Sequence, residues 1–400
     1  MTRVAAGTVV TRNFLSFART LTRSFQQHHP DVPFFVLLAD EVGAAFDPAD
    51  EHFRTLLLDS ISLPRLERFQ FRYSRHYVAV AAKPYLLQFL LDSGYERAIY
   101  LDADVLMTSN INPLLFPSHS YSIALTPHLL SPASGELRIE GELTILRAGV
   151  YNAGFVAVSE SPSGRDFLSW WQDRLHLHCR HDLPNAMHAD QRWLDLVPLF
   201  FDGVSIIRDP TCNVAYWNLE ERALAWRDGT LTVNGEPCRF FHFSGFDPDA
   251  PRLTKHSDGP DASTTSSVSA LFERYAAMLK AAGFDETRDL PHAYQWFDNG
   301  VEIPEIARGR YLDFGDAVDN FGNPFETASP GSYYRWLIES PDIEVEPSRR
   351  INHLWEAVYR KRPDVQATFP DYRESHRDAF LEWARTSGAS EHRIAAEFLK

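Results

Sequence analysis

Two acidic side chains, Asp102 and Asp104, stand two positions apart directly after a short apolar run, Ala98–Leu101. In extended backbone, residues i and i+2 point to the same side, so the two carboxylates would lie close enough to raise each other's pKa. Such a pair favours a cation, and carboxylate oxygens at the mouth of a sheet suit Mg²⁺ or Mn²⁺, which keep positions open for a diphosphate. The alternative interpretation is a polar strand end with two solvated aspartates.

Two basic side chains could complete such a site. Lys83 precedes Pro84, which suits the first turn of a helix, so its ammonium would add to the positive end of the helix dipole, where a phosphate is favoured. The alternative is a surface lysine. His242 lies in the aromatic run Phe240–Phe243, which predicts a mostly buried strand, and its imidazole could be a metal ligand or a hydrogen-bonded core histidine.

A third group combines amide and acidic side chains with a glycine. Asn152 can donate and accept, and Gly154 lacks a Cβ, so a ligand could approach the backbone of the predicted strand 149–158; a turn or bulge is the alternative. Asp190 and Gln191 follow a stretch of small residues. The alternative interpretation is that Asp190 is the N-cap of a helix.

The elements that must position these residues alternate along the first hundred positions. Apolar spacing predicts a strand at Gly7–Thr11, a helix over 14–28, a buried strand at Pro33–Ala39, a helix at Pro84–Ser93 and the strand Ala98–Leu101. This alternation predicts an α/β fold with a mostly parallel sheet and helices on both faces. Such sheets bind their ligands at the carboxyl ends of the strands.

The composition changes after His256. Residues 257–269 are rich in Ser, Thr, Asp, Gly and Pro and show no apolar periodicity, as expected of a linker. Helical patterns follow at 271–282, 351–360 and 376–385. The predicted organisation is an α/β domain over 1–256, a linker over 257–269 and a mainly helical domain over 270–400.

Charge and cysteine content exclude several classes of protein. The chain has 400 residues, 54 acidic and 39 basic, and a formal net charge of −15, which disfavours a broad nucleic-acid-binding face. Three cysteines without CxxC spacing favour a reducing compartment over a disulfide scaffold. Because no signal peptide and no 18-residue apolar run occur, we expect a cytoplasmic protein without a transmembrane segment. Peripheral membrane contact and the oligomeric state stay open.

Five segments, in this order, resemble those of the metal-dependent glycosyltransferases of GT-A fold, especially glycosyltransferase family 8 and its bacterial relatives. They are Thr11–Phe14, Lys83 followed by the strand Tyr100–Asp104, Asn152–Phe155, Asp190–Gln191 and His242–Gly245. The resemblance covers about residues 7–256 and implies a GT-A-type, Rossmann-like mixed sheet. In one departure, Phe246-Asp247-Pro248 replaces the Lys-Pro-Trp that the family often has, and a lysine follows only at Lys255.

The resemblance also implies roles for individual residues. Asp102, Asp104 and His242 would hold Mn²⁺ or Mg²⁺. Thr11 and Asn13 would contact the nucleoside, and the residues expected to bind the transferred sugar are Asn152, Asp190 and Gln191. The donor side would be completed by Ala103, Gly245 and a lysine on the diphosphate, either Lys83 or Lys255.

The implied reaction moves a hexose from a UDP-sugar to a glycan or another hydroxyl acceptor, with retention of configuration. A sugar-nucleotide pyrophosphorylase is an alternative, although the turn Thr11–Phe14 is bulky where such enzymes need a Gly-rich phosphate loop. A catalytically silent nucleotide-sugar or glycan-binding module is another. The sequence contains no GxxxxGK[ST], GxGxxG, GxSxG or HExxH pattern, which weakens ATPase, dehydrogenase, esterase and metalloprotease interpretations.

Overall fold

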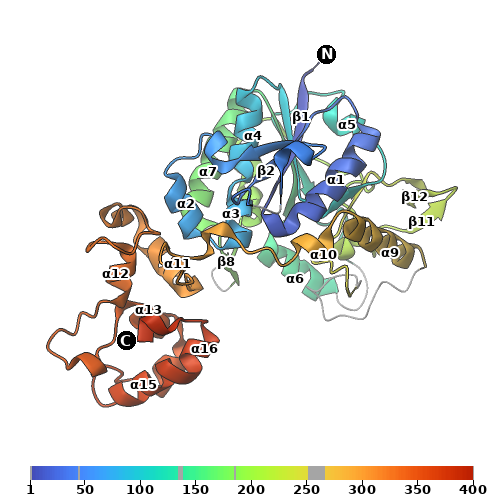
Figure 1. Ribbon diagram of the computed structural model, residues 1–400. Coiled ribbons are helices and arrows are strands. Elements are labelled where there is room, and N and C mark those ends of the chain that lie inside the picture. Colours follow the sequence, from blue (N-terminus) through green and yellow to red (C-terminus); the bar gives the residue numbers. More distant parts are fainter. Residues whose placement is uncertain (1, 44–45, 134–137, 184–185, 251–265, 400) are drawn as a thin grey trace. The chain divides into compact units, whose positions relative to one another are not determined.

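The computed structural model describes residues 2–43, 46–133, 138–183, 186–250 and 266–399 (Figure 1). Contacts among them divide the chain into two compact units. Unit 1 comprises Met1–Leu63 and Ala79–His292, and unit 2 comprises Pro64–Val78 and Ala293–Lys400. Residues 270–292, which the composition places in the helical domain, pack in unit 1 here. The predicted linker lies mostly outside the described residues.

Unit 1 is built on a seven-stranded sheet with the order β10-β6-β7-β4-β1-β2-β3. Strand β7 runs antiparallel to both of its neighbours, and the other neighbouring pairs are parallel. The predicted mixed, mostly parallel α/β sheet is therefore confirmed. The strands are β1 Val4–Val10, β2 Phe34–Leu38, β3 Arg54–Leu57, β4 Arg97–Leu101, β6 Ile123–Pro127, β7 Tyr151–Ser159 and β10 Val204–Ile206.

Helices cover both faces of this sheet, and every residue of β1 is buried as a result. On one face, Val4 and Val10 share a core with Phe25 of α1 (Leu15–His28). On the other face, a Cβ added at Gly7 would touch Leu86 of α4 (Lys83–Asp92), and α7 (Pro162–His178) packs on α4. The helices predicted over 14–28 and 84–93 are confirmed.

A separate two-stranded ribbon follows the carboxyl end of β4. It pairs β5 (Val105–Met107) with β14 (Phe240–His242) in antiparallel register, His242 opposite Val105. The chain must therefore turn sharply between β4 and β5, and Val105 N donates to the carbonyl of Asp102 at 3.1 Å. Asp102–Asp104 thus forms a turn, and our prediction of extended backbone there was wrong.

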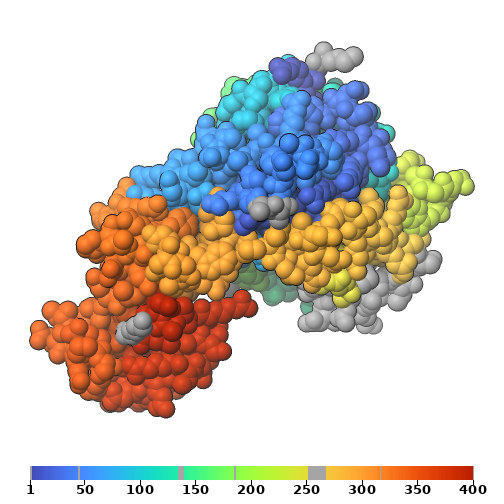
Figure 2. Space-filling model, in the orientation of Figure 1, coloured from blue at the N-terminus to red at the C-terminus, as the bar shows by residue number. Residues whose placement is uncertain are grey.

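Apart from α6 and α9, the remaining elements of unit 1 are short. They are α5 Asn112–Leu115, α6 Arg138–Ala148, β8 His181–Asp182, β9 Met187–His188, α8 Val197–Phe200, β11 Leu224–Arg227, β12 Thr230–Val233, β13 Glu236–Pro237, α9 Ser266–Ala281 and α10 Phe284–Thr287. Helix α9 is the predicted helix 271–282, and its Tyr275 stacks on Phe243 with ring centroids 3.8 Å apart. The β11–β12 hairpin projects from the surface of unit 1 (Figure 2).

Unit 2 is helical. Its helices are α2 Leu66–Arg72, α11 Glu305–Asp313, α12 Tyr333–Ile338, α13 His353–Lys361, α14 Pro363–Thr368, α15 Arg377–Trp383 and α16 Ala389–Glu391, while α3 (Arg75–Ala81) spans the boundary between the units. Phe71 packs edge-on against Tyr311 and Tyr333 in the core of this unit. The predicted helices 351–360 and 376–385 correspond to α13 and α15. Among the described helices, none has both the length and the apolarity needed to cross a bilayer.

Candidate functional site

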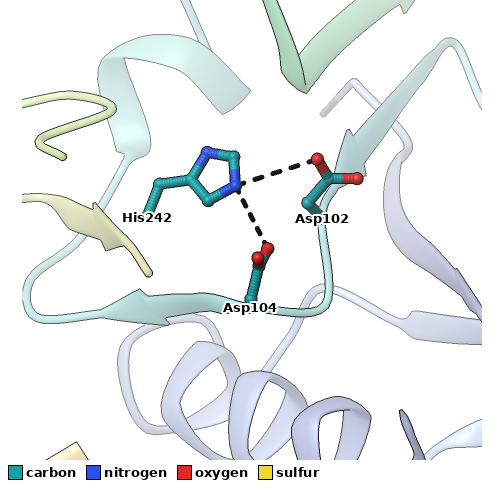
Figure 3. A group of neighbouring side chains, drawn as sticks. All are labelled: Asp102, Asp104 and His242. Carbon is teal, nitrogen blue, oxygen red and sulfur yellow. Dashed lines mark ion pairs between the residues drawn. The ribbon is translucent and has the colours of Figure 1, made fainter. Parts of the chain in front are cut away.

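Asp102, Asp104 and His242 converge at the carboxyl edge of the main sheet (Figure 3). One ligand atom from each lies within 4.8 Å of the others. The two aspartates come from the turn after β4, and His242 ends β14. Because Phe243 N donates to the carbonyl of Asp104 at 2.8 Å, the ribbon fixes the histidine beside the turn. His242 Nε2 lies 3.1 Å from Asp104 Oδ1 and 3.9 Å from Asp102 Oδ2.

The other nitrogen of the imidazole faces two amide oxygens. His242 Nδ1 lies 3.2 Å from Asn152 Oδ1 and 3.2 Å from Asn213 Oδ1. Burial alone would lower the pKa of His242, but the adjacent Asp104 carboxylate outweighs it and raises the pKa. Burial likewise opposes ionisation of Asp104, yet His242 lowers the pKa of that carboxyl. Each of the two groups therefore favours the charged form of the other.

Lys83, the first residue of α4, lies between two carboxylates. Its Nζ is 2.9 Å from Asp102 Oδ1 and 2.9 Å from Asp190 Oδ2, and it stands 4.7 Å from the centre of the Tyr100 ring. Burial would lower the pKa of Lys83, but the two carboxylates raise it well above its ordinary value. The side chain is buried, so the alternative of a surface lysine was wrong.

Asp190 occupies the N-cap position of a 3₁₀ helix, Gln191–Leu196, without capping it. Its side chain accepts no hydrogen bond from that helix and pairs with Lys83 instead. Burial, together with the nearby Asp102 carboxylate, raises the pKa of Asp190 in spite of the lysine. The Asp190 side chain therefore does not cap the helix, as the alternative considered from the sequence would require.

Gln191 and Asn152 form one hydrogen-bonded unit. Gln191 Oε1 accepts from Asn152 Nδ2 at 3.0 Å and from Ala153 N at 3.2 Å, and Gln191 Nε2 donates to Ala148 O at 3.0 Å. Asn152 is joined in turn to His242, and Lys83 Nζ donates to Ala153 O at 3.3 Å. The predicted sugar-binding and metal-binding residues are thus parts of one connected network.

Gly154 leaves space for the imidazole. A Cβ at this position would lie 2.7 Å from His242 Nδ1 and 2.7 Å from Asn152 Oδ1, closer than real side chains approach. The glycine is therefore required by the close approach of His242 to β7, and the Asn-x-Gly pattern has a packing reason.

The other predicted site residues lie around this centre. Thr11 and Asn13 follow β1 at the same sheet edge, both buried, with Thr11 Oγ1 donating to Asn13 Oδ1 at 2.6 Å. Ala103 is buried within the Asp102–Asp104 turn. Gly245 adopts a left-handed backbone with φ 72° just after β14. Lys255 lies outside the described residues.

Sequence reasoning missed Asn213, Trp217 and His128. Asn213 is fully buried and contacts His242 as above, while the Trp217 ring packs edge-on against His242 with centroids 5.3 Å apart. His128 approaches Asn152 Nδ2 through its Nε2 at 3.4 Å and packs against Trp217. The available signal was a pair of asparagines, Asn213 and Asn218, with Trp217 between them. Asn213 is 61 positions from Asn152, so the sequence does not indicate that the two side chains meet.

The chemistry of the donor set fits a divalent cation. Two carboxylates and an imidazole nitrogen are ligands that Mn²⁺ and Mg²⁺ accept, and carboxylate-rich sites suit both ions. A carbonyl or amide acceptor on the far nitrogen of a ligating histidine is the usual outer-shell arrangement, and Asn152 and Asn213 provide it here. Among the described residues this is the one cluster of at least three such ligands.

Comparison with protein-family models gives no match for this chain. Two curated relatives come from Bacillus subtilis (strain 168) and are described as uncharacterized. The chain is 27% identical to YfnF over 253 residues, which are 60% of this chain and 80% of YfnF. It is 25% identical to YfnD over 248 residues, which are 60% of this chain and 76% of YfnD.

The chain resembles solved structures of glycosyltransferases, among them LgtC and GlyE. The galactosyltransferase LgtC, crystallised with donor and acceptor sugar analogues, is 17% identical and has a TM-score of 0.37, covering 72% of this chain and 97% of LgtC. The glycosyltransferase GlyE of Streptococcus pneumoniae TIGR4 is 14% identical and has a TM-score of 0.41, covering 74% of this chain and 67% of GlyE.

Proposed function

We propose that this protein is a metal-dependent glycosyltransferase that moves a hexose from a UDP-sugar to the hydroxyl group of a glycan or another acceptor. The observation that carries the proposal is the convergence of Asp102, Asp104 and His242 at the carboxyl edge of the sheet. Edges of this kind are where open α/β sheets bind nucleotides and other ligands. The sequence segments that resemble family 8 supply the choice of a nucleotide-sugar donor.

On the donor side, Asp102, Asp104 and His242 would hold Mn²⁺ or Mg²⁺. Such an ion supplies neutralising charge to a diphosphate leaving group. Thr11 and Asn13 would receive the nucleoside, because they follow β1 at the same edge as the acidic turn. Gly245 would belong to the same donor side, and the role of Lys255 stays a prediction.

Lys83 would act on the donor in a second way, besides the predicted contact with the diphosphate. Its ammonium is already satisfied by Asp102 and Asp190, so it would hold these two carboxylates at a fixed spacing. A diphosphate that approaches Asp102 would still meet this buried positive charge. The lysine would therefore act on the donor through its electrostatic field as well as through direct contact.

On the sugar side, Asn152, Asp190 and Gln191 would orient the transferred hexose. Hydrogen bonds hold Asn152 and Gln191 to each other and to the backbone, and the ion pair with Lys83 holds Asp190. Side chains held in this way before a ligand arrives meet the condition for orienting a reacting group. Asp190 would stabilise positive charge that develops on the sugar, and no protein nucleophile is needed if the acceptor attacks from the face that the leaving group departs. The proposed outcome is retention.

The test is calorimetric titration of UDP into metal-free protein, with and without Mn²⁺, because this needs no acceptor. We expect Mn²⁺-dependent binding of UDP that weakens at least about 100-fold in Asp104→Asn and in His242→Ala, since each removes a ligand from a three-residue site. Asp202→Asn, at an exposed carboxylate of unit 1, is the matched control and should bind like the parent.

Three results would redirect the assignment. A folded protein that binds no UDP in any condition would remove the UDP-sugar donor. Pyrophosphate-dependent exchange into a nucleotide sugar would identify a nucleotidyltransferase. Tight nucleotide-sugar binding without transfer or hydrolysis, over a broad acceptor set, would favour the binding-module alternative.

A further inference from the structure

A groove of about 1220 Å³ opens at one end of the β5–β14 ribbon, and the candidate cation site stands at the other end. Thr108, just after β5, and Arg239, just before β14, line the groove, whereas Asp104 and His242 stand at the opposite ends of these strands. At about 3.3 Å per residue, the ribbon separates the two places by about 10 Å. Of the described residues that line the groove, none was predicted for the reaction site.

Arg239 joins three of the segments that line the groove. Its Nε donates to Asp209 Oδ2 at 3.0 Å, one of its terminal nitrogens donates to Asn110 O at 2.7 Å, and its carbonyl accepts from Thr108 N at 2.9 Å. Asp209 Oδ1 in turn accepts from the backbone N–H of Thr211 at 2.9 Å. These bonds fix the segments relative to one another, so the groove does not depend on a ligand for its shape.

The ring of Phe116 lines the same groove and is 49% exposed. Its backbone is held in place on both sides of the preceding peptide bond. Phe116 N donates to Asn112 O at 2.7 Å, and the carbonyl of Leu115 accepts from the buried guanidinium of Arg97. Because the backbone is already ordered, the ring can receive the apolar face of a ligand at a small cost in entropy.

Polar side chains accompany this ring. Asn112, Ser118 and Glu236 are exposed and line the groove, and their side chains form no hydrogen bond with any other residue that the structure describes. They offer an amide, a hydroxyl and a carboxylate, which between them donate and accept. A sugar ring has an apolar C–H face and an edge of hydroxyl groups, so an aromatic ring with such neighbours matches it.

Charge and size narrow the class of ligand further. The guanidinium of Arg239 is paired with Asp209, and burial lowers the pKa of His28, so this lining imidazole is neutral at pH 7. The described lining therefore presents no unpaired positive charge, and Glu236 adds a negative one, which disfavours phosphates and nucleic acids. The volume exceeds the about 300–1,000 Å³ that is usual for small ligands, so a ligand of several linked units fits better than one ring.

We propose that this groove is a secondary binding site for a neutral oligosaccharide, separate from the site of transfer. Phe116 would stack on the face of one sugar ring, and Asn112, Ser118 and Glu236 would bond the hydroxyl groups of adjoining rings. A glycan held here by units that do not react would raise the local concentration of its acceptor hydroxyl near the cation site. This last role rests on the proposed function, whereas the binding itself does not.

The experiment measures sugar binding by the full chain without metal or nucleotide. The probes are oligosaccharides of glucose, galactose and mannose, from disaccharides to hexasaccharides, together with the three monosaccharides. Binding is detected by saturation-transfer NMR and quantified by calorimetric titration. We expect at least one series to bind, with an affinity that rises with chain length to at least about tenfold above that of the monosaccharide, because the groove takes several units.

Variants then locate the bound sugar. Phe116→Ala should weaken binding about tenfold, since it removes the stacking ring, while Phe116→Tyr keeps a ring and should bind within about threefold of the parent. Glu236→Gln should also bind within about threefold, as expected for a neutral ligand. Phe200→Ala is the matched control, because Phe200 is another exposed phenylalanine of unit 1 and does not line the groove.

Four results would overturn the inference. They are the absence of binding by every probe, equal affinity in Phe116→Ala and the parent, loss of binding in Glu236→Gln, which would indicate a cationic ligand, and displacement of the sugar by UDP with Mn²⁺, which would place it at the reaction site. If the sugar binds through Phe116 while the parent binds no UDP, the groove stands and the transferase proposal falls. If UDP binds with Mn²⁺ and no probe sugar binds, the proposed donor site stands and the groove falls.

Discussion

At the scale of residues, the charge balance of the site depends on Lys83. Three carboxylates, Asp102, Asp104 and Asp190, share a small volume, and the basic groups that face them are Lys83 and His242. Lys83 is buried and pairs with Asp102 and Asp190. The cost of burying a charge is offset only while its partners are present, so removal of one member leaves the others uncompensated.

Lys83→Met should therefore destabilise unit 1 strongly. We expect a loss of about 3 kcal/mol in the free energy of unfolding, measured by urea denaturation without metal. The double variant Lys83→Met with Asp190→Asn should recover about 1 kcal/mol or more of that loss. The reason is that the asparagine at position 190 is neutral, so only one carboxylate, Asp102, is left without its lysine partner. A loss below about 1 kcal/mol in Lys83→Met would show that the ion pairs contribute little to the fold.

At the scale of elements, the buried side chain of His29 connects the end of α1 to the start of α5. His29 follows the last residue of α1, and its Nε2 accepts a hydrogen bond from the backbone N–H of Ile111, just before α5, at 3.0 Å. Burial, with a further effect from neighbouring His28, lowers the pKa of His29 to about 4. The neutral ring is therefore the form that connects these helices.

This link predicts a pH dependence of stability with a definite sign. The unfolded chain binds a proton at His29 below about pH 6.5 and the folded chain only below about 4, so stability falls as the pH drops through that window. From pH 7 to pH 5 the contribution of this group falls by about 2 kcal/mol. His29→Gln should be less stable at pH 7 but should lack this part of the pH slope, as measured by urea unfolding at both values.

The matched control for this prediction is His119→Gln, at an exposed loop position of the same unit. It should keep the slope of the parent. If His29→Gln keeps the parental slope as well, protonation of His29 does not contribute to acid destabilisation.

At the scale of the whole molecule, unit 2 is assembled from two separate parts of the sequence. Residues 64–78 contribute α2, and Phe71 at its end packs among aromatic side chains of residues 293–400, including Phe297 and Tyr333. Arg308 is buried and donates to the carbonyls of Phe71 and Tyr73. A chain cut after His292 therefore lacks these partners of α2.

A chain that ends at His292 should expose this apolar surface. We expect it to bind the hydrophobic dye ANS and to elute from size-exclusion chromatography as larger species, whereas the full chain should not. Adding Phe71→Ser to the truncated chain should reduce both effects, because the substitution removes an aromatic ring whose partners Phe297 and Tyr333 the truncation deletes. A truncated chain that stays monomeric and binds no dye would show that residues 64–78 find other cover.

Much of the fold could be predicted because local pattern and tertiary structure agree in the sheet. β1, α1, β2, α4 and β4 follow the apolar spacing that packing on both faces requires. The turn at Asp102–Asp104 could not be predicted, since its cause is the pairing of β5 with β14, more than 130 positions later. The contribution of residues 64–78 to unit 2 escaped prediction for the same reason.

For the site, the sequence by itself determined which ligand types are present, because the acidic pair, the histidine in its aromatic run and the Asn-x-Gly segment are visible as residue types in order. Only the tertiary structure decided how they are used. It placed Lys83 between two carboxylates and brought Asn213 to His242. The physical reason is that ion pairs and hydrogen bonds depend on distances of about 3 Å between groups remote in sequence, which only the packed sheet and ribbon set.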